Sequence, residues 1–199
     1  MNFLNSLKKD RLVRIKFFTS LSFAFNFIYA LFNFIVGIYL RSYWFITIGA
    51  YFFVLGFMRS FSIISIIRKK DKNLNKIIGF LLIFLIIILV AMMALSDMFD
   101  VIKPLNEIIM ISIATFTTAK TVIAILNTVK AKRLTVSYLA IRNLSLVSAS
   151  FSILSMQRSM LVSFGNMSIN NIRIFNFSTG FAFFLFLLVL IVIMIKRKS

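Results

Sequence analysis

Three cationic side chains lie inside long apolar stretches of the sequence, at Arg59, Lys120 and Arg158. A charged group within a membrane-spanning segment is costly, rare and usually functional, because little water is present to solvate it. The competing explanation is that the long side chain extends to the headgroups, and it is strongest for the arginines, which lie nearer the ends of their stretches. Lys120 lies near the middle of its stretch, so it is the leading candidate for a ligand-binding residue.

Lys120 has no acidic residue at its depth in the membrane. Three explanations of such a cation stay open: contact with carbonyl groups at a helix C-terminus, a neutral amine, or an anionic ligand. The anionic ligand is the sharpest hypothesis, because Asn33 is expected to face Lys120 with Tyr29 nearby. Asn127 shares a helical face with Lys120.

Arg158 has acidic candidates of its own, since Asp97 and Asp100 lie at the end of a neighbouring apolar stretch. The candidate substrate-binding residues are Tyr29, Asn33, Arg59, Lys120, Asn127 and Arg158. No acid or amide cluster within the stretches indicates a metal site.

Small and hydroxyl residues form stripes at helical spacing beside these cations. The clearest stripe consists of Ser145, Ser148, Ser152, Ser155, Ser159 and Ser163, and another contains Thr19, Ser22, Asn26, Tyr29, Asn33 and Gly37. Such stripes allow membrane helices to pack closely and to form hydrogen bonds with one another. Packing is the simpler explanation for the serines, and a wet cavity is the alternative.

Catalysis has little support in the composition. The chain has no His and no Cys, which excludes disulfides, a thiol nucleophile, a Cys/His zinc site and a Ser-His triad. A pair formed by Lys120 and a serine is chemically available, but abundant serines make it a weak indication. We expect no enzyme and no cofactor, and no nucleotide-binding motif indicates self-powered ATP-driven transport.

Composition indicates the class of protein. The 199 residues are 61% hydrophobic and 14% charged, whereas an average soluble domain is about 45–50% apolar. The mean hydropathy is +1.00, and 23 Lys and Arg against 5 Asp and Glu give a net charge of +18. These values predict a polytopic membrane protein with cationic loops.

Six apolar stretches are long enough for a membrane-spanning helix, which needs about 20 residues. They cover about 17–40, 43–67, 77–96, 107–129, 143–164 and 174–195. The first is too long for a signal peptide and lacks an Ala-x-Ala cleavage site, so we expect it to be retained. The sequence predicts one all-α membrane domain over 1–199, with a basic head at 1–16 and a basic tail at 196–199.

Loop charges predict the orientation. One side would carry 17 cations: Lys8, Lys9, Arg11, Arg14, Lys16, Arg68, Lys69, Lys70, Lys72, Lys76, Lys130, Lys132, Arg133, Arg142, Lys196, Arg197 and Lys198. The other side would carry Arg41, Lys103 and Arg173. The positive-inside rule therefore predicts a multi-pass cell-membrane protein of the bacterial inner membrane with both termini cytoplasmic. The basic runs are suited to anionic lipids, and without interleaved aromatic residues they do not indicate nucleic-acid binding.

The C-terminal three stretches repeat part of the pattern of the first three. Arg59-Ser60 aligns with Arg158-Ser159, and Phe52 aligns with Phe151. Apolar matches are common in Phe-rich and Leu-rich helices, so the arginine pair carries most of the weight. Since three helices are an odd number, the second unit would be inverted, as in transporters and channels whose sites lie near the midplane.

Several motifs also carry a resemblance to a known family. They are Tyr29-Ala-x-x-Asn33-x-x-x-Gly37, Ser42-x-Trp44-Phe45, Tyr51-x-x-x-Leu55-x-x-Met58-Arg59, Lys120-x-x-x-Ala124-Ile125-x-Asn127 and Ser178-Thr179-Gly180. Over most of its length the chain resembles an uncharacterised family of six-helix integral membrane proteins of low-GC Gram-positive bacteria. The resemblance implies that Tyr29, Asn33, Arg59 and Lys120 belong to a shared pattern. Arg158 departs from that pattern, in which a smaller polar residue is expected.

Two functions are expected from these observations. The first is a small transporter or channel for an anionic or polar solute that uses the intramembrane cations. The alternative is a binding or scaffold subunit that works with partners or as a homo-oligomer. In size, helix number and charge the chain is similar to the vitamin-binding membrane subunits of energy-coupling-factor transporters, but it lacks their Ala-x-x-x-Ala docking pattern in the first helix.

Overall fold

A computed structural model describes residues 11–67, 74–99, 105–130, 136–164 and 168–196. These residues form six α-helices: α2 (Arg11–Leu40), α3 (Tyr43–Ile67), α4 (Leu74–Phe99), α5 (Glu107–Lys130), α6 (Val136–Phe164) and α7 (Ile169–Lys196). The part of the chain that the structure describes contains no strand, which confirms the predicted all-α class. Residues 1–10 of the predicted basic head and 197–199 of the predicted tail lie outside the described residues.

Local sequence explains where the helices begin. None of the six contains a proline, so beyond the first turn of each helix every backbone N–H can join the helical hydrogen-bond pattern. Polar residues precede three helices: the carbonyls of Ser42, Asn106 and Ser168 accept the first backbone hydrogen bonds of α3, α5 and α7. The Ser168 hydroxyl also accepts a bond from the Asn171 N–H at 3.4 Å, which is typical of an N-cap.

Several helices begin earlier than the predicted spans. Helix α2 begins at Arg11 rather than 17, α6 at Val136 rather than 143, and α7 at Ile169 rather than 174. The predictions followed apolar residues, whereas a helix continues wherever its backbone hydrogen bonds continue. The added turns are more polar than the stretches that follow them, and such turns suit the headgroup region of a bilayer.

Five of the described helices, α2, α3, α4, α5 and α7, are long and apolar enough to cross a bilayer, and the chain is a helical membrane protein. Helix α6 contains the serine stripe, which lowers its hydropathy. It packs against α3, α4, α5 and α7, so its polar side chains are covered by protein. Ser148, Ser152 and Ser155 are fully buried.

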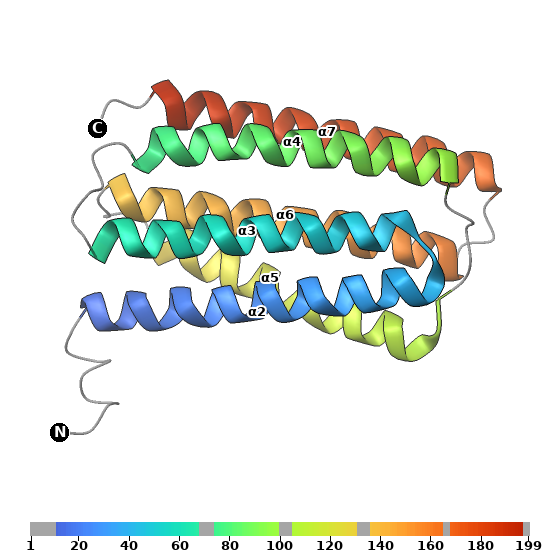
Figure 1. Ribbon diagram of the computed structural model, residues 1–199, viewed down its shortest axis with the longest axis horizontal. Coiled ribbons are helices and arrows are strands. Elements are labelled where there is room, and N and C mark those ends of the chain that lie inside the picture. Colours follow the sequence, from blue (N-terminus) through green and yellow to red (C-terminus); the bar gives the residue numbers. More distant parts are fainter. Residues whose placement is uncertain (1–10, 68–73, 100–104, 131–135, 165–167, 197–199) are drawn as a thin grey trace.

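The helices run up and down in one bundle (Figure 1). Helix α2 begins and α7 ends at the same end of the bundle, which we call the proximal end, and the opposite end is the distal end. Helices α3 and α6 contact each other in the middle, with α4 and α7 side by side along one flank and α2 and α5 along the other.

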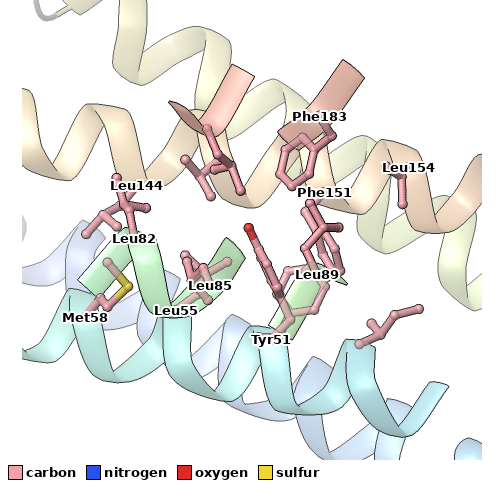
Figure 2. Close-up of a cluster of buried hydrophobic side chains, with 14 of the residues drawn as sticks. Tyr51, Leu55, Met58, Leu82, Leu85, Leu89, Leu144, Phe151, Leu154 and Phe183 are labelled. Carbon is pink, nitrogen blue, oxygen red and sulfur yellow. The ribbon is translucent and has the colours of Figure 1, made fainter. Parts of the chain in front are cut away.

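A layer of apolar side chains joins α3, α4, α6 and α7 (Figure 2). The Tyr51 ring of α3 stacks on Phe151 of α6 with ring centroids 3.6 Å apart. Leu82, Leu85 and Leu89 of α4 are fully buried at one helical spacing against this layer. Since lipid tails are as apolar as leucine, close packing rather than removal from water stabilises such a layer in a membrane.

The surface of the bundle is rich in apolar side chains. Ile35, Phe80, Ile111 and Phe177 are among the large exposed residues, on α2, α4, α5 and α7. The near absence of polar residues from the middle of α4 and α7 predicts that both helices face lipid, with the core formed by the other four helices. The prediction is right only in part. Helices α3 and α6 are in the middle, but α2 and α5 lie on a flank, and α4 and α7 each bury one face against the rest of the bundle.

The turn between α2 and α3 places these helices in close contact. The Ser42 N–H donates to the Gly37 carbonyl at 2.9 Å, and the Arg41 N–H donates to the Ile38 carbonyl at 3.3 Å. This is a Schellman motif, in which glycine usually occupies the left-handed position. Here that position is Arg41, with φ of 52°.

Replacing Arg41 with glycine should therefore stabilise the protein, because glycine adopts the left-handed conformation without a clash of its Cβ atom. We expect a net gain of about 0.5–1 kcal/mol, because relief of the left-handed strain exceeds the entropy cost of glycine, and it would be measured as a higher midpoint of thermal unfolding in detergent. Arg41→Ala keeps the Cβ atom and removes the charge, so it serves as the control. An equal increase for both variants would attribute the gain to charge and contradict the backbone explanation.

Candidate functional site

Arg59 extends into the bundle rather than to the headgroups. Its side chain is 1% exposed, although it lies roughly two helical turns from the end of α3. One guanidinium nitrogen donates to the Ser22 hydroxyl of α2. The other lies 3.4 Å from the Ser145 hydroxyl and 3.5 Å from the Leu144 carbonyl, both on α6. Three helices therefore surround this charge.

Lys120 extends into the same interior from α5 and is 3% exposed. Its ammonium nitrogen donates to the Ser148 hydroxyl at 3.1 Å. The Ser148 hydroxyl in turn donates to the Asn26 side-chain oxygen at 3.4 Å. The ammonium also lies 5.2 Å from the centroid of the Phe116 ring and 5.8 Å from that of Phe52. Both distances are within the range of a cation–π contact.

We call this group of residues, Arg59, Lys120, Asn26 and Ser148, the Arg59–Lys120 site. The two cations share one interior, because their partners lie about one helical turn apart on the same helices: Ser22 and Asn26 on α2, and Ser145 and Ser148 on α6. Among the described residues, both cations donate hydrogen bonds to neutral oxygen atoms, and the nearest acid of α4, Asp97, forms its ion pair with Arg173 at 3.0 Å. Placing a charge in a membrane helix costs about 2.5–3.5 kcal/mol, so two like charges here require compensation.

Several buried polar atoms in this interior have no hydrogen-bond partner among the described residues. They are Nε of Arg59, Nδ2 of Asn26, the Tyr29 hydroxyl, Oδ1 of Asn33 and the Ser155 hydroxyl. A buried donor or acceptor without a partner costs about 1–3 kcal/mol. Two of these atoms, on Arg59 and Asn26, are donors within the Arg59–Lys120 site, and donors are what an anion requires.

Aromatic rings cover the site on its distal side. Tyr29 of α2 stacks on Phe116 of α5 with centroids 3.5 Å apart, and Phe52 meets both rings edge-on. Helices α2 and α5 make far fewer backbone contacts with each other than α2 makes with α3, so this stack is a main link between them. The rings close the interior between α2 and α5.

The remaining candidates lie at varied distances from Lys120. Tyr29 is in the aromatic cover, and its hydroxyl lies near Asn33 and Ser155 without a hydrogen bond of acceptable geometry. The Asn33 amide donates to the Tyr29 carbonyl at 2.7 Å within α2, rather than to a group beside Lys120. Asn127 lies on α5, but its side chain is outside the described part of the structure.

Arg158 lies in a different place from the other two cations. It donates to the Ser96 hydroxyl of α4, and its guanidinium carbon lies 3.9 Å from the centroid of the Trp44 ring of α3. The sequence offered Asp97 or Asp100 as its partner. Asp97 instead pairs with Arg173. Both side chains of this pair are exposed, so the pair costs less desolvation than a buried pair with Arg158 would. Asp100 lies outside the described residues.

Sequence reasoning missed the two residues that lie next to Lys120. Asn26 and Ser148 were each part of a polar stripe, but neither was a candidate binding residue. Asn26 and Asn33 are seven positions apart and share a helical face, so periodicity alone does not distinguish them. The tilt of α5 decides which of the two is at the depth of Lys120. The signal available in the sequence was that both residues belong to polar stripes within apolar stretches.

The described residues contain no group of three or more acidic, His or Cys side chains suited to a metal ion. Comparison of the chain with protein-family models, with curated proteins and with solved structures gives no match. The function is therefore argued from the chemistry of the chain's own residues.

Proposed function

We propose that this protein binds a small anion or acidic solute at the Arg59–Lys120 site and transports it across the membrane. Arg59 and Lys120 would supply the charge, and Asn26 and Ser148 would complete the set of donors. The observation that carries the proposal is that two buried cations share one interior, where their described partners are neutral. An anion between them would offset their repulsion and the cost of their burial.

The site is closed in this conformation, since both cations are almost completely buried. Transport therefore requires a second conformation, in which the Tyr29–Phe116 stack separates or the proximal ends of the helices part. Buried serines of α6, among them Ser145 and Ser152, would supply polar contacts along the path. The same serines also serve helix packing, as their hydrogen bonds to backbone carbonyls within α6 indicate.

We further propose six spans with both termini on the cytoplasmic side of a bacterial cell membrane. Helix α6 would be the sixth span, its serines covered by the surrounding helices. Helices α2, α4 and α6 begin at the proximal end, and α3, α5 and α7 end there. These are the helix ends next to the basic runs of the sequence. By the positive-inside rule this end would face the cytoplasm and contact anionic lipids.

An inverted repeat of three helices each is proposed on the pattern of contacts. Helices α3 and α6 meet in the middle, and α4 and α7 lie side by side, as a two-fold axis would require. Arg59 of α3 reaches the first half of α6, and Arg158 of α6 reaches the start of α3 at Trp44. Their other partners differ, since Ser22 lies on α2 and Ser96 on α4, so any symmetry is approximate.

Reconstitution of the purified protein into liposomes tests the transport proposal. Vesicles loaded with a chloride-sensitive or iodide-sensitive dye should show protein-dependent anion entry, and acetate and phosphate should be compared as competing solutes. Protein-free vesicles and vesicles with Arg41→Gln, an exposed residue at the distal end, are the controls. Anion entry equal to that of protein-free vesicles for the whole panel would contradict the proposal.

A second candidate function is a membrane-embedded binding or scaffold subunit, as in the energy-coupling-factor transporters. The closed interior favours it, because a site sealed by packed aromatic rings needs an external event to open. Purification in mild detergent would then yield a stoichiometric partner or a homo-oligomer. Anion binding by the isolated chain without flux, with flux restored by the partner, would favour this candidate over the first.

A further inference from the structure

A groove separate from the Arg59–Lys120 site lies at the distal end of the bundle, where α4 and α7 run side by side. Its volume is about 850 Å³, which is within the usual range of roughly 300–1,000 Å³ for small-molecule sites. Neither Arg59 nor Lys120 is among its described lining residues, so a ligand in the groove would not touch that site. We call it the α4–α7 groove.

The walls of the groove are largely apolar and open toward lipid. Val90 of α4 and Phe177 and Phe181 of α7 line it and are also exposed on the surface of the bundle. Behind them the two helices are in close contact, since a Cβ atom on Gly180 would lie 2.7 Å from the Met93 side chain. A ligand with a long apolar part can therefore enter sideways from the bilayer and lie between the helices.

The length of the groove matches one leaflet of a bilayer. Its α7 lining extends from Asn170 to Phe184, about 21 Å along the helix axis. A bilayer is about 40–45 Å thick with its headgroup regions, so one leaflet is about half of that. The exposed charged residues of the lining, Asp97 and Arg173, lie near the distal ends of α4 and α7. The groove therefore has the length and the polarity of one lipid molecule in the distal leaflet.

The polar side chains deeper in the groove make their contacts with the protein itself. Arg158 donates to the Ser96 hydroxyl and lies with its guanidinium carbon 3.9 Å from the centroid of the Trp44 ring. All three side chains are buried. They form part of the wall, and the groups that can receive a headgroup are those at the exposed end.

At that end the rim is the ion pair of Arg173 and Asp97. Arg173 Nε lies 3.0 Å from Asp97 Oδ1, and an outer guanidinium nitrogen donates to the Asp97 carbonyl at 3.2 Å. These contacts use two of the five guanidinium N–H donors and one of the two carboxylate oxygens. Both side chains are at least half exposed, so each can take a further partner. A headgroup that carries a phosphate and an ammonium is complementary to both members, whereas a purely anionic headgroup would be repelled by Asp97.

We propose that the α4–α7 groove binds one zwitterionic phospholipid of the distal leaflet. Its phosphate would contact Arg173, its ammonium group would contact Asp97, and one acyl chain would lie along Phe177 and Phe181. Such a lipid is held at a fixed position, while the lipids around the rest of the bundle exchange freely. The groove does not contain Arg59 or Lys120 among its described lining residues, so this proposal and the transport proposal can each fail without the other.

The chain itself supplies the reporter for a test. Trp44 is its single tryptophan, lines the groove and is 4% exposed. Bromine atoms on an acyl chain quench tryptophan fluorescence at short range. Titration of the full chain in a non-ionic detergent with brominated phosphatidylcholine should give saturable quenching at one lipid per chain. Since Trp44 lies at the start of α3, near the distal end, bromines near the carboxyl end of the acyl chain should quench more than bromines near its methyl end.

A matched pair of substitutions locates the bound lipid. Ala94→Phe adds bulk at an exposed lining residue and should weaken the apparent affinity by about tenfold or more, while helical content and elution volume stay unchanged. Ala182→Phe is the control, because Ala182 is an exposed alanine of α7 that is not among the described lining residues of the groove. This variant should bind like the unmodified protein.

The headgroup contact is tested separately. Arg173→Gln should weaken binding of phosphatidylcholine by about tenfold, since a charge-assisted contact to the phosphate is removed. Brominated diacylglycerol, which has no phosphate, should bind the unmodified protein about as weakly as phosphatidylcholine binds the variant. Brominated phosphatidylglycerol, which is anionic, should bind more weakly than phosphatidylcholine.

Four results would overturn the proposal. Absent or non-saturable quenching of Trp44 would show that no lipid is held in the groove. Equal effects of Ala94→Phe and Ala182→Phe would place the lipid elsewhere. Equal affinity for diacylglycerol and phosphatidylcholine, unchanged by Arg173→Gln, would assign the groove to apolar chains alone. Tighter binding of phosphatidylglycerol than of phosphatidylcholine would contradict recognition of a zwitterionic headgroup by the Arg173–Asp97 pair.

Discussion

Lys120→Met should strongly reduce anion binding and flux while leaving the protein folded. Methionine has nearly the length of lysine and no charge, so the packing against Phe52 and Phe116 is retained. Removing one partner of a buried charge contact costs about 2–5 kcal/mol, which corresponds to a loss of roughly 30-fold or more in binding. The variant should also be more stable when no anion is present, because the repulsion with Arg59 is removed. The measurements are anion entry into liposomes and the midpoint of thermal unfolding.

Lys76→Met is the matched control for this prediction. Lys76 lies near the start of α4 and is exposed. Its substitution by methionine is therefore the same chemical change, made outside the interior. It should leave anion flux unchanged. Flux by Lys120→Met equal to that of the unmodified protein would remove Lys120 from the site and contradict the proposed function.

Asn26→Asp should place a carboxylate of the protein itself beside Arg59 and Lys120, whose described partners are neutral. Asparagine and aspartate have nearly the same shape, and Asn26 is fully buried next to Ser148, one hydrogen bond from Lys120. A fixed carboxylate there compensates the two cations without paying the entropy of binding a separate ion. We expect thermal stability to rise, and anion binding to fall at least tenfold, because the internal carboxylate competes for the same donors.

The control for this variant is Asn26→Leu, which removes the amide without adding charge. It should lower affinity modestly and should not raise stability. Increased anion flux in Asn26→Asp, or equal effects of the two substitutions, would show that the compensation of Arg59 and Lys120 by a negative charge is not the function of this interior.

The elements of this fold could be predicted from the sequence because a membrane helix must satisfy all of its own backbone hydrogen bonds. Because of that requirement each span is one continuous apolar stretch, and each of the six predicted stretches lies within one of the six described helices or overlaps it. The ends could not be predicted in the same way. Charged residues such as Arg11 continue a helix beyond the apolar stretch, and no apolar pattern marks them.

The site could be predicted only in part, because the depth and rotation of each helix depend on its neighbours. Three cations at unusual positions identified Arg59, Lys120 and Arg158 as candidates, and all three are buried. Which polar residue lies beside Lys120 depends on the tilt of α5 against α2, so the stripe suggested Asn33 where the structure has Asn26 and Ser148. For Arg158, the competition of Arg173 for Asp97 depended on the packing of α4 against α7.

The most direct test of the central claim is to locate an anion in the interior. Crystals of the protein grown or soaked with bromide or iodide would show the ion by its anomalous scattering. The proposed function predicts a peak within hydrogen-bonding distance of the Lys120 ammonium, on the side facing Arg59, and its loss in Lys120→Met. An interior without such a peak, in crystals whose surface sites are occupied by the halide, would contradict it.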